Sequence, residues 1–191
     1  DKFDSFNSVD MKKKGDWWEA EIKTNSNTEL LAFMFESDES YFTNNNQSYF
    51  VKMCDSSGNI TTGAKLAYYT AKYIWGPRTV GLAVTRTGDP EEQKEINSLI
   101  DSVPEKKASY MNLLLRSTIK NRVDKQDFDV IRIIEEYIAD SAKTDDDYKN
   151  LIYGETVIGN QIRAKELFNE AVAKFPESSY FQVNSQTQSI T

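Results

Sequence analysis

The chain has 191 residues, 39% of them hydrophobic and 12% aromatic, which is enough for one large domain or two small ones with a buried core. Its formal net charge of −7 argues against nucleic acid as a partner, because phosphate binding needs clustered Lys and Arg. The absence of His removes the commonest general base, the commonest zinc ligand and every Ser-His or Cys-His nucleophile pair. We therefore expect no catalytic residue, no metal site, no cofactor and no enzymatic activity from this chain alone.

The sequence contains no apolar stretch near the roughly 20 residues that a membrane-spanning helix needs, so we expect no transmembrane segment. Its first residue is Asp rather than Met, which indicates processing or an arbitrary boundary, and any signal peptide or lipid anchor of a precursor would have been removed. The one basic run, Lys12-Lys13-Lys14, precedes Gly15, and we interpret it as a solvated loop at a turn.

Residues 1–88 show the pattern of short β-strands, and we expect them to form an antiparallel, immunoglobulin-like β-sandwich. In DWWEAEIKT, Trp18, Ala20 and Ile22 share one face of a strand and Trp17 lies on the other. One of the two adjacent tryptophans is therefore expected in the core.

Further strands are expected at 30–37, as a central buried strand, at 48–55 and at 78–86, with a long polar loop at 36–47. The only cysteine, Cys54, lies in an apolar strand pattern and is expected to be a buried core thiol, so the chain has no internal disulfide and no C-x-x-C pair. The aromatic segment 62–79 fits a helical face and also an irregular edge, so we interpret it as mixed.

From residue 89 the hydrophobic period changes to 3.6, and residues 89–191 are expected to form a second, helical domain. Asp89 is the expected N-cap of the first helix, with Pro90 at its first position. Asp124 and Thr144 are the expected caps of two later helices, and Gly159 is expected to separate the last two. The expected inward-facing stripes are Ile96, Leu99 and Ile100, then Tyr110, Leu113, Leu114 and Ile119, then Phe128, Ile131, Ile134 and Ile138.

The last helix carries Ala164, Phe168, Ala171 and Pro176 at the spacing of the second helix of a tetratricopeptide-like repeat. Small residues allow close helix packing, Phe fills the space between the paired helices, and Pro ends the second helix. In the first helix Tyr148 and Leu151 match the repeat, whereas Ile152 and Glu155 do not. We therefore expect one repeat-like hairpin, used as a packing unit rather than as part of a peptide-binding solenoid.

The segments KGDWWEAEI, LLAFMFESD, TNNNQSYFVKMCDSSGN and GAKLAYY, followed by DPEEQKEINSLIDSVPEKKASYMNLL and the repeat-like hairpin, resemble the N-terminal region of exported bacterial TlpA-like thiol:disulfide oxidoreductases. The resemblance implies a periplasmic or cell-envelope location and a C-terminal thioredoxin-like domain, or its protein clients, as partner. The redox chemistry of such proteins belongs to a C-x-x-C motif that this sequence lacks. The chain would then be a non-catalytic accessory region, and the residues from 178 a linker or a first downstream strand.

A carbohydrate-binding or protein-binding module is the alternative function, because sandwiches bind glycans by stacking sugar rings on exposed aromatic side chains. The candidate stacking residues are Trp17, Trp18, Tyr73 and Trp75, in a set that also contains Tyr68 and Tyr69. Packing between the sandwich and the helices is the competing interpretation of the same residues. Of the densest acidic groups, Glu135-Glu136 splits between two faces of a helix and Asp145-Asp146-Asp147 suits a helix N-terminus, so neither is expected to be catalytic.

Overall fold

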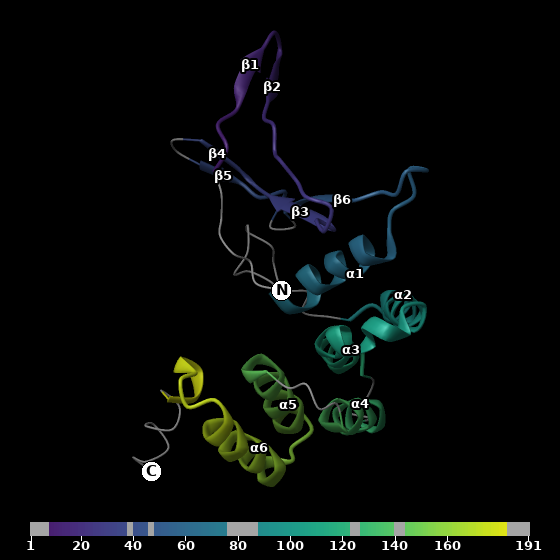
Figure 1. Cartoon of the computed structure of the whole chain (residues 1–191), viewed down its shortest axis with the longest axis vertical. Coiled ribbons are helices and arrows are strands. Elements are labelled where there is room, and N and C mark those ends of the chain that lie inside the picture. Colours follow the sequence, from purple (N-terminus) through teal and green to yellow (C-terminus); the bar gives the residue numbers. More distant parts are fainter. Residues whose placement is uncertain are drawn as a thin grey trace.

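The computed structural model describes residues 8–37, 40–45, 48–75, 88–122, 127–139 and 144–182, and within them the chain is an α+β protein. The strands come first: β1 (Lys12–Lys14), β2 (Trp17–Glu19), β3 (Leu30–Phe33), β4 (Phe35–Ser37), β5 (Ser40–Phe42) and β6 (Tyr49–Lys52). The helices follow: α1 (Thr62–Thr70), the π-helix η1 (Ala71–Trp75), α2 (Pro90–Asp101), the 3₁₀-helix η3 (Pro104–Lys106), α3 (Lys107–Asn121), α4 (Phe128–Ala139), α5 (Asp145–Val157) and α6 (Gln161–Lys174). Figure 1 shows the β1–β2 hairpin at one end of the molecule, α6 at the other, and α1 between the strands and the remaining helices.

The six strands form three antiparallel two-stranded sheets, β1–β2, β3–β6 and β4–β5. Two expectations about loops are wrong. The basic run Lys12–Lys14 is strand β1, and the turn comes after it, where Gly15 adopts a φ of +63° that suits glycine. The expected loop at 36–47 contains strand β5, because Ser40–Phe42 pairs with Phe35–Ser37.

The described strands do not close into a sandwich. Every residue of β1, β2, β4 and β5 is exposed, and β3 is only partly buried rather than a central strand. Both adjacent tryptophans are exposed, so the expectation that one of them enters the core is wrong. Alternation predicts a strand, but burial also needs a second layer, and the β1–β2 pair packs against none within the described residues.

Cys54 is exposed, which corrects the expectation of a buried thiol. It lies just after β6 in an isolated β-bridge with Ile60, and this bridge closes the Asp55–Asn59 turn at the edge of the sheet. In that turn Gly58 has a φ of +84°, a backbone conformation that suits glycine. The strand expected at 78–86 and the cap Asp124 lie outside the described residues.

The segment interpreted as mixed is helical over Thr62–Trp75, as α1 followed by η1. The side chain of Thr61 caps α1 by accepting from the backbone N–H of Ala64 at 3.1 Å. Leu66, Tyr69 and Tyr73 are buried, so this segment joins the helical core although it precedes the expected domain boundary at 88.

Two predicted helix starts are confirmed. Asp89 accepts from the backbone N–H groups of Glu91 and Glu92, with Pro90 at the first helical position of α2. Thr144 and Asp147 form a capping box at the start of α5. These side chains satisfy N–H groups that a helix cannot satisfy internally, which is why local sequence alone located both ends.

The core lies among the helices. Within the described residues, the buried apolar side chains run from Ala64 in α1 to Phe181 in the helical turn 179–182. Helix α3 occupies the centre, because it contacts η1, α2, α4 and α5. None of the helices in this described part is both long and apolar enough to cross a membrane. The largest fully buried side chains are Tyr148, Phe181, Leu66, Ile96, Ile100, Leu113, Leu115, Ile133, Ile134, Leu151, Leu167 and Val130.

The predicted inward stripes are correct for α2 and α3 but wrong in part for α4. Ile96, Ile100, Leu113, Leu114 and Ile119 are buried, and Leu99 and Tyr110 pack partly against the core. On α4, however, Phe128 is 83% exposed and Ile131 is 40% exposed. The buried face of α4 consists of Val130, Ile133, Ile134 and Tyr137.

Helices α5 and α6 form a tightly packed hairpin that turns at Gly159, where φ is +83°. Ala164, Phe168 and Ala171 are buried in it, and α6 ends two residues before Pro176. Tyr148 and Leu151 are buried on α5, as the repeat spacing predicts. Glu155, at a mismatched position of the repeat, is also buried, with 5% of its surface exposed.

Candidate functional site

The β1–β2 hairpin is the first candidate site, because it carries two of the predicted stacking residues. Lys13 pairs with Trp18 and Lys14 pairs with Trp17 across the two strands. Directly opposed residues of an antiparallel pair point to the same face, and successive residues point to opposite faces. Each face of the hairpin therefore presents one indole ring beside one lysine side chain.

Both indole rings of the hairpin are open to solvent. Trp17 is 78% exposed and Trp18 is 61% exposed. The hairpin's one ion pair among the described residues, Lys14 with Glu19 at 3.1 Å, is itself exposed and contributes little to stability. Such a hairpin can insert its rings against an apolar surface on either side, and its lysines can pair with acidic groups at the rim of that surface.

The other two predicted stacking residues do not join this surface. Tyr73 is 3% exposed in the helical core, and its hydroxyl donates to Glu92 Oε2 at 3.0 Å. Burial, reinforced by Glu92, raises the pKa of Tyr73 to about 12. Trp75 is the last residue of η1, and its side chain lies outside what the structure describes. Tyr73 therefore serves packing, and of the predicted stacking residues whose side chains the structure describes, only the two on the hairpin are open to solvent.

The strands expose more apolar surface than the sequence pattern predicts. On the β4–β5 hairpin Phe35 is paired with Phe42 on one face. Tyr41, which pairs with Glu36, lies on the opposite face. These side chains fit the alternating pattern of a half-buried sheet, and only a missing second layer distinguishes them from core residues. The exposed large apolar side chains of the strand region are Val9, Met11, Trp17, Trp18, Ile22, Phe35, Tyr41, Phe42, Val51 and Ile60.

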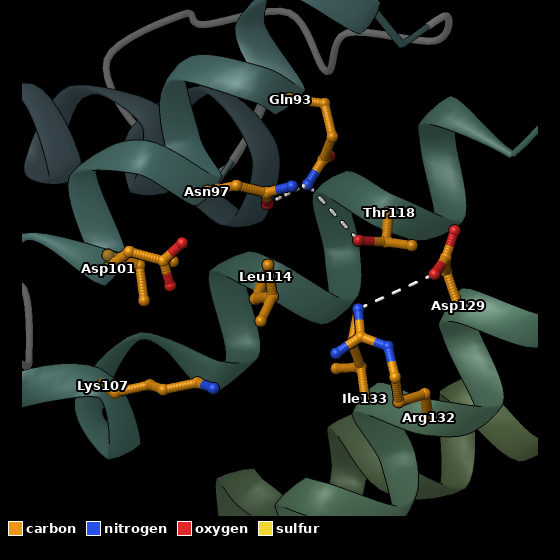
Figure 2. A pocket seen from close by; sticks show the side chains of 10 residues that line it. Gln93, Asn97, Asp101, Lys107, Leu114, Thr118, Asp129, Arg132 and Ile133 are labelled. Carbon is orange, nitrogen blue, oxygen red and sulfur yellow. Dashed lines mark hydrogen bonds and ion pairs between the residues drawn. The ribbon is translucent and has the colours of Figure 1, made fainter. Parts of the chain in front are cut away.

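A polar pocket of about 230 Å³ lies between α2, α3 and α4. Figure 2 shows the amide of Gln93 pointing toward Asn97 and Thr118 and donating to both, at 2.9 and 3.4 Å. On the other side of the pocket Arg132 pairs with Asp129 at 3.7 Å. Because these polar groups already satisfy one another, the pocket carries no functional assignment.

Nothing in the described part of the chain gathers three or more His, Cys, Asp or Glu side chains in a position to hold a metal ion. The acidic run at 145–147 is used by the helix that it begins: Asp147 completes the capping box, and Asp145 and Asp146 pair with Lys149 at 3.1 and 2.8 Å. Glu136 pairs with Lys107 of α3. The acidic run therefore stabilises the start of α5, as its position in the sequence predicted, whereas Glu136 links α4 to α3.

Comparisons with protein-family models, with curated proteins and with solved structures found no match to this chain.

Proposed function

We propose that this chain is a non-catalytic protein-binding region and that its β1–β2 hairpin docks on a partner protein. The observation that carries the proposal is the exposure of Trp17 and Trp18, 78% and 61%, on a hairpin whose residues are all exposed. Tryptophan is enriched among residues that dominate protein interfaces. Burying an indole ring on a partner contributes roughly 4–6 kcal/mol of gross transfer free energy, so exposed rings favour association.

We also propose that the strand region is immunoglobulin-like and that the α5–α6 hairpin is tetratricopeptide-like. An immunoglobulin-like arrangement of the strand region is supported by the antiparallel pairing of its six described strands, although these strands do not close into a sandwich. A tetratricopeptide-like unit is supported by the packed α5–α6 hairpin, in which the small and aromatic residues of the motif are buried.

The proposed partner is a thioredoxin-like domain, or a client protein of one, in an exported protein of the bacterial cell envelope. Support comes from the resemblance of the strand segments and of the segment 89–114 to the region that precedes such domains. The hairpin geometry adds to it, because β1 and β2 each pair only with one another in the described residues and leave strand edges open. Open edges accept a further strand from a partner.

Carbohydrate binding is the second candidate function. One observation favours it: Trp17 is exposed on a strand face as a ring that a sugar can stack on. The two rings cannot form one platform for a sugar, because side chains alternate along a strand and Trp17 and Trp18 therefore point to opposite faces. A glycan site would therefore use one ring on each side.

Tryptophan fluorescence tests both functions. The chain has three Trp, so a Trp75→Phe background leaves Trp17 and Trp18 as the only indole reporters. We expect a blue shift of their emission on addition of a purified thioredoxin-like domain, and no shift with cello- or chito-oligosaccharides. A shift with the sugars alone would replace protein binding by glycan binding, and no shift with either would overturn the proposal.

Pull-down with the same thioredoxin-like domain compares a hairpin variant with a matched control variant. Trp17→Ala with Trp18→Ala is expected to abolish capture without changing the unfolding transition, because neither ring contributes to the core. Phe128→Ala removes an equally exposed aromatic side chain from α4, at the helical end of the molecule, and should leave capture unchanged.

A further inference from the structure

A groove of about 560 Å³ runs beside α4, the end of α5 and the start of α6. Its volume is within the range of pockets that bind small ligands or single side chains, about 300–1,000 Å³. It is separate from the hairpin, because no residue of a strand lines it. The lining residues are Asp127, Ile131, Ile134, Glu135, Ile138, Glu155, Ile158, Asn160 and Arg163, and we call it the isoleucine groove.

Four isoleucines give the groove an apolar wall. Ile134 is 2% exposed and belongs to the core, whereas Ile131 is 40% exposed. Ile138 and Ile158 are partly buried against the same core. An aliphatic chain of a ligand would therefore replace water along Ile131, Ile138 and Ile158 without moving the helices.

Glu155 is the buried polar group of the groove. It lines the groove with 5% of its surface exposed, and its Oε2 has no hydrogen-bond partner within the described residues. A buried carboxyl oxygen without a partner is unusual, because leaving a polar group unsatisfied costs about 1–3 kcal/mol. Burial raises the pKa of Glu155, and Glu135 acts in the same direction, while Asn160 and Arg163 oppose them.

The charges around Glu155 leave the groove with unpaired negative charge. Asp127 is bound by Arg122 at 2.8 Å, and Arg163 is bound by Glu166 at 2.8 Å. Glu135 is exposed, and among the residues that the structure describes no cation forms an ion pair with it. The site therefore combines an apolar wall with two carboxyl groups that form no ion pair within the described part of the chain, although Arg163, bound by Glu166, also acts on Glu155 electrostatically.

We propose that the isoleucine groove binds an alkylammonium group, with the aliphatic chain against Ile131, Ile138 and Ile158 and the ammonium between Glu155 and Glu135. A compact ammonium supplies three donors, and one of them can satisfy the orphaned Oε2 of Glu155. Two sources carry this chemistry: a lysine side chain presented by a peptide and a free aliphatic amine. An alcohol of the same length can donate only a neutral, weaker hydrogen bond to Oε2, and a carboxylate of that length is repelled, so both bind less tightly.

The test is a titration followed by the δ1-methyl NMR signals of the isoleucines. We expect hexylamine to shift the signals of Ile131, Ile134, Ile138 and Ile158, and to leave those of Ile96 and Ile100 in the α2 core unchanged. Hexanol and hexanoate should bind at least about tenfold more weakly, which is the effect of one charge-assisted hydrogen bond. The peptide acetyl-Leu-Lys-Leu-amide distinguishes the sources: tighter binding than hexylamine assigns the site to a lysine side chain, and weaker binding assigns it to a free amine.

Three variants make the result specific. Glu155→Gln keeps the shape of the side chain and is expected to weaken hexylamine binding about tenfold or more. Ile131→Ala changes a partly exposed wall residue, so it retains the fold and should weaken binding by a smaller factor. Glu177→Gln removes the same charge from an exposed residue outside the groove and should have no effect.

Equal affinity for hexylamine and hexanol, or unchanged affinity in both Glu155→Gln and Ile131→Ala, would overturn the proposal. Absence of shifts at the four groove isoleucines would do so too. The expected binding also strengthens as pH rises through the raised pKa of Glu155, because only the ionised carboxylate attracts the ammonium.

Discussion

The guanidinium of Arg116 on α3 donates two hydrogen bonds to Oδ1 of Asn150 on α5, at 3.0 and 2.8 Å. Asn150 is 6% exposed, and its own amide donates to the backbone oxygen of Asp146 at 2.7 Å. The ring of Tyr153 lies 3.8 Å from Arg116 Cζ and covers the guanidinium. These contacts fix α5 against the central helix by polar groups that water reaches poorly.

Replacing Asn150 by Ala should therefore destabilise the protein by about 2 kcal/mol, because the half-buried cation loses both hydrogen bonds. Urea unfolding measures the difference. Asn169→Ala removes an exposed amide from α6 and should change stability by less than about 0.5 kcal/mol. Equal effects of the two variants would show that the Arg116–Asn150 contact does not stabilise the fold.

Gly154 on α5 marks a close approach of α4. A Cβ at this position would lie 3.0 Å from Cδ1 of Ile134 and 3.4 Å from Cδ2 of Leu115. We expect Gly154→Ala to lower stability by about 1 kcal/mol, because overpacking in the core exceeds the gain in helix propensity.

A second variant identifies the cause of that loss. Ile134→Val removes the Cδ1 methyl that the new Cβ would meet. In the Ile134→Val background the loss caused by Gly154→Ala should fall toward zero or reverse, as thermal or urea unfolding of the four proteins in this cycle would show. An equal loss of stability from Gly154→Ala in both backgrounds would show that contact with Ile134 Cδ1 is not its cause.

Glu155 should make stability depend on pH in the direction opposite to most carboxylates. Because burial raises its pKa in the folded state, the folded protein binds this proton more tightly than the unfolded chain does. The stabilisation that this proton binding gives the folded state is therefore full below the ordinary pKa of Glu155, and it is lost as pH rises through the raised pKa. We expect Glu155→Gln to unfold at a higher urea concentration than the natural protein at about pH 8, and the difference to shrink at about pH 4.

Comparing the two proteins at each pH isolates Glu155 from other carboxylates. The pKa values of Asp145, Glu95 and Glu170 are lowered by their partners. Protonation of these groups in acid therefore destabilises both proteins to the same extent. A variant that is less stable than the natural protein at both pH values would mean that the ionised carboxylate stabilises the fold.

Cys54 should react in the folded protein, since its side chain is exposed. We expect Ellman's reagent to modify one thiol per chain without denaturant, at a rate close to that in urea. Cys54→Ser should leave the unfolding free energy within about 0.5 kcal/mol of the natural value. A thiol that reacts only after unfolding would restore the interpretation of a core residue.

The features that sequence predicted correctly are those decided by local chemistry. Asp89 and Thr144 satisfy backbone donors within three residues of themselves, so their role does not depend on the rest of the fold. On helix α4, by contrast, hydrophobic periodicity did not determine which face is buried. Its two possible stripes both contain Ile134, and the structure buries Tyr137, whose hydroxyl donates to Asp147 of the next helix, and leaves Phe128 exposed.

Both candidate sites depend on partners that a single sequence does not contain. The alternation around Trp17 and Trp18 predicted the strand but not the lack of a covering layer. For the isoleucine groove a signal was present: Glu155 stands where the repeat has an aromatic residue. A carboxyl group at a position that is apolar in the motif indicated a buried charge, but only the packing of α4 against α5 showed that its Oε2 is unsatisfied.

The burial of Leu66, Tyr69 and Tyr73 among the helices determines where the chain can be cut for expression. A fragment that starts at Gly88 would leave α2 without its contacts to α1 and α3 without its contacts to η1, and should aggregate. A fragment that starts at Thr61 keeps the cap of α1 and the whole helical core. Limited proteolysis should therefore release a resistant fragment that begins before α1, and the strands should be digested first.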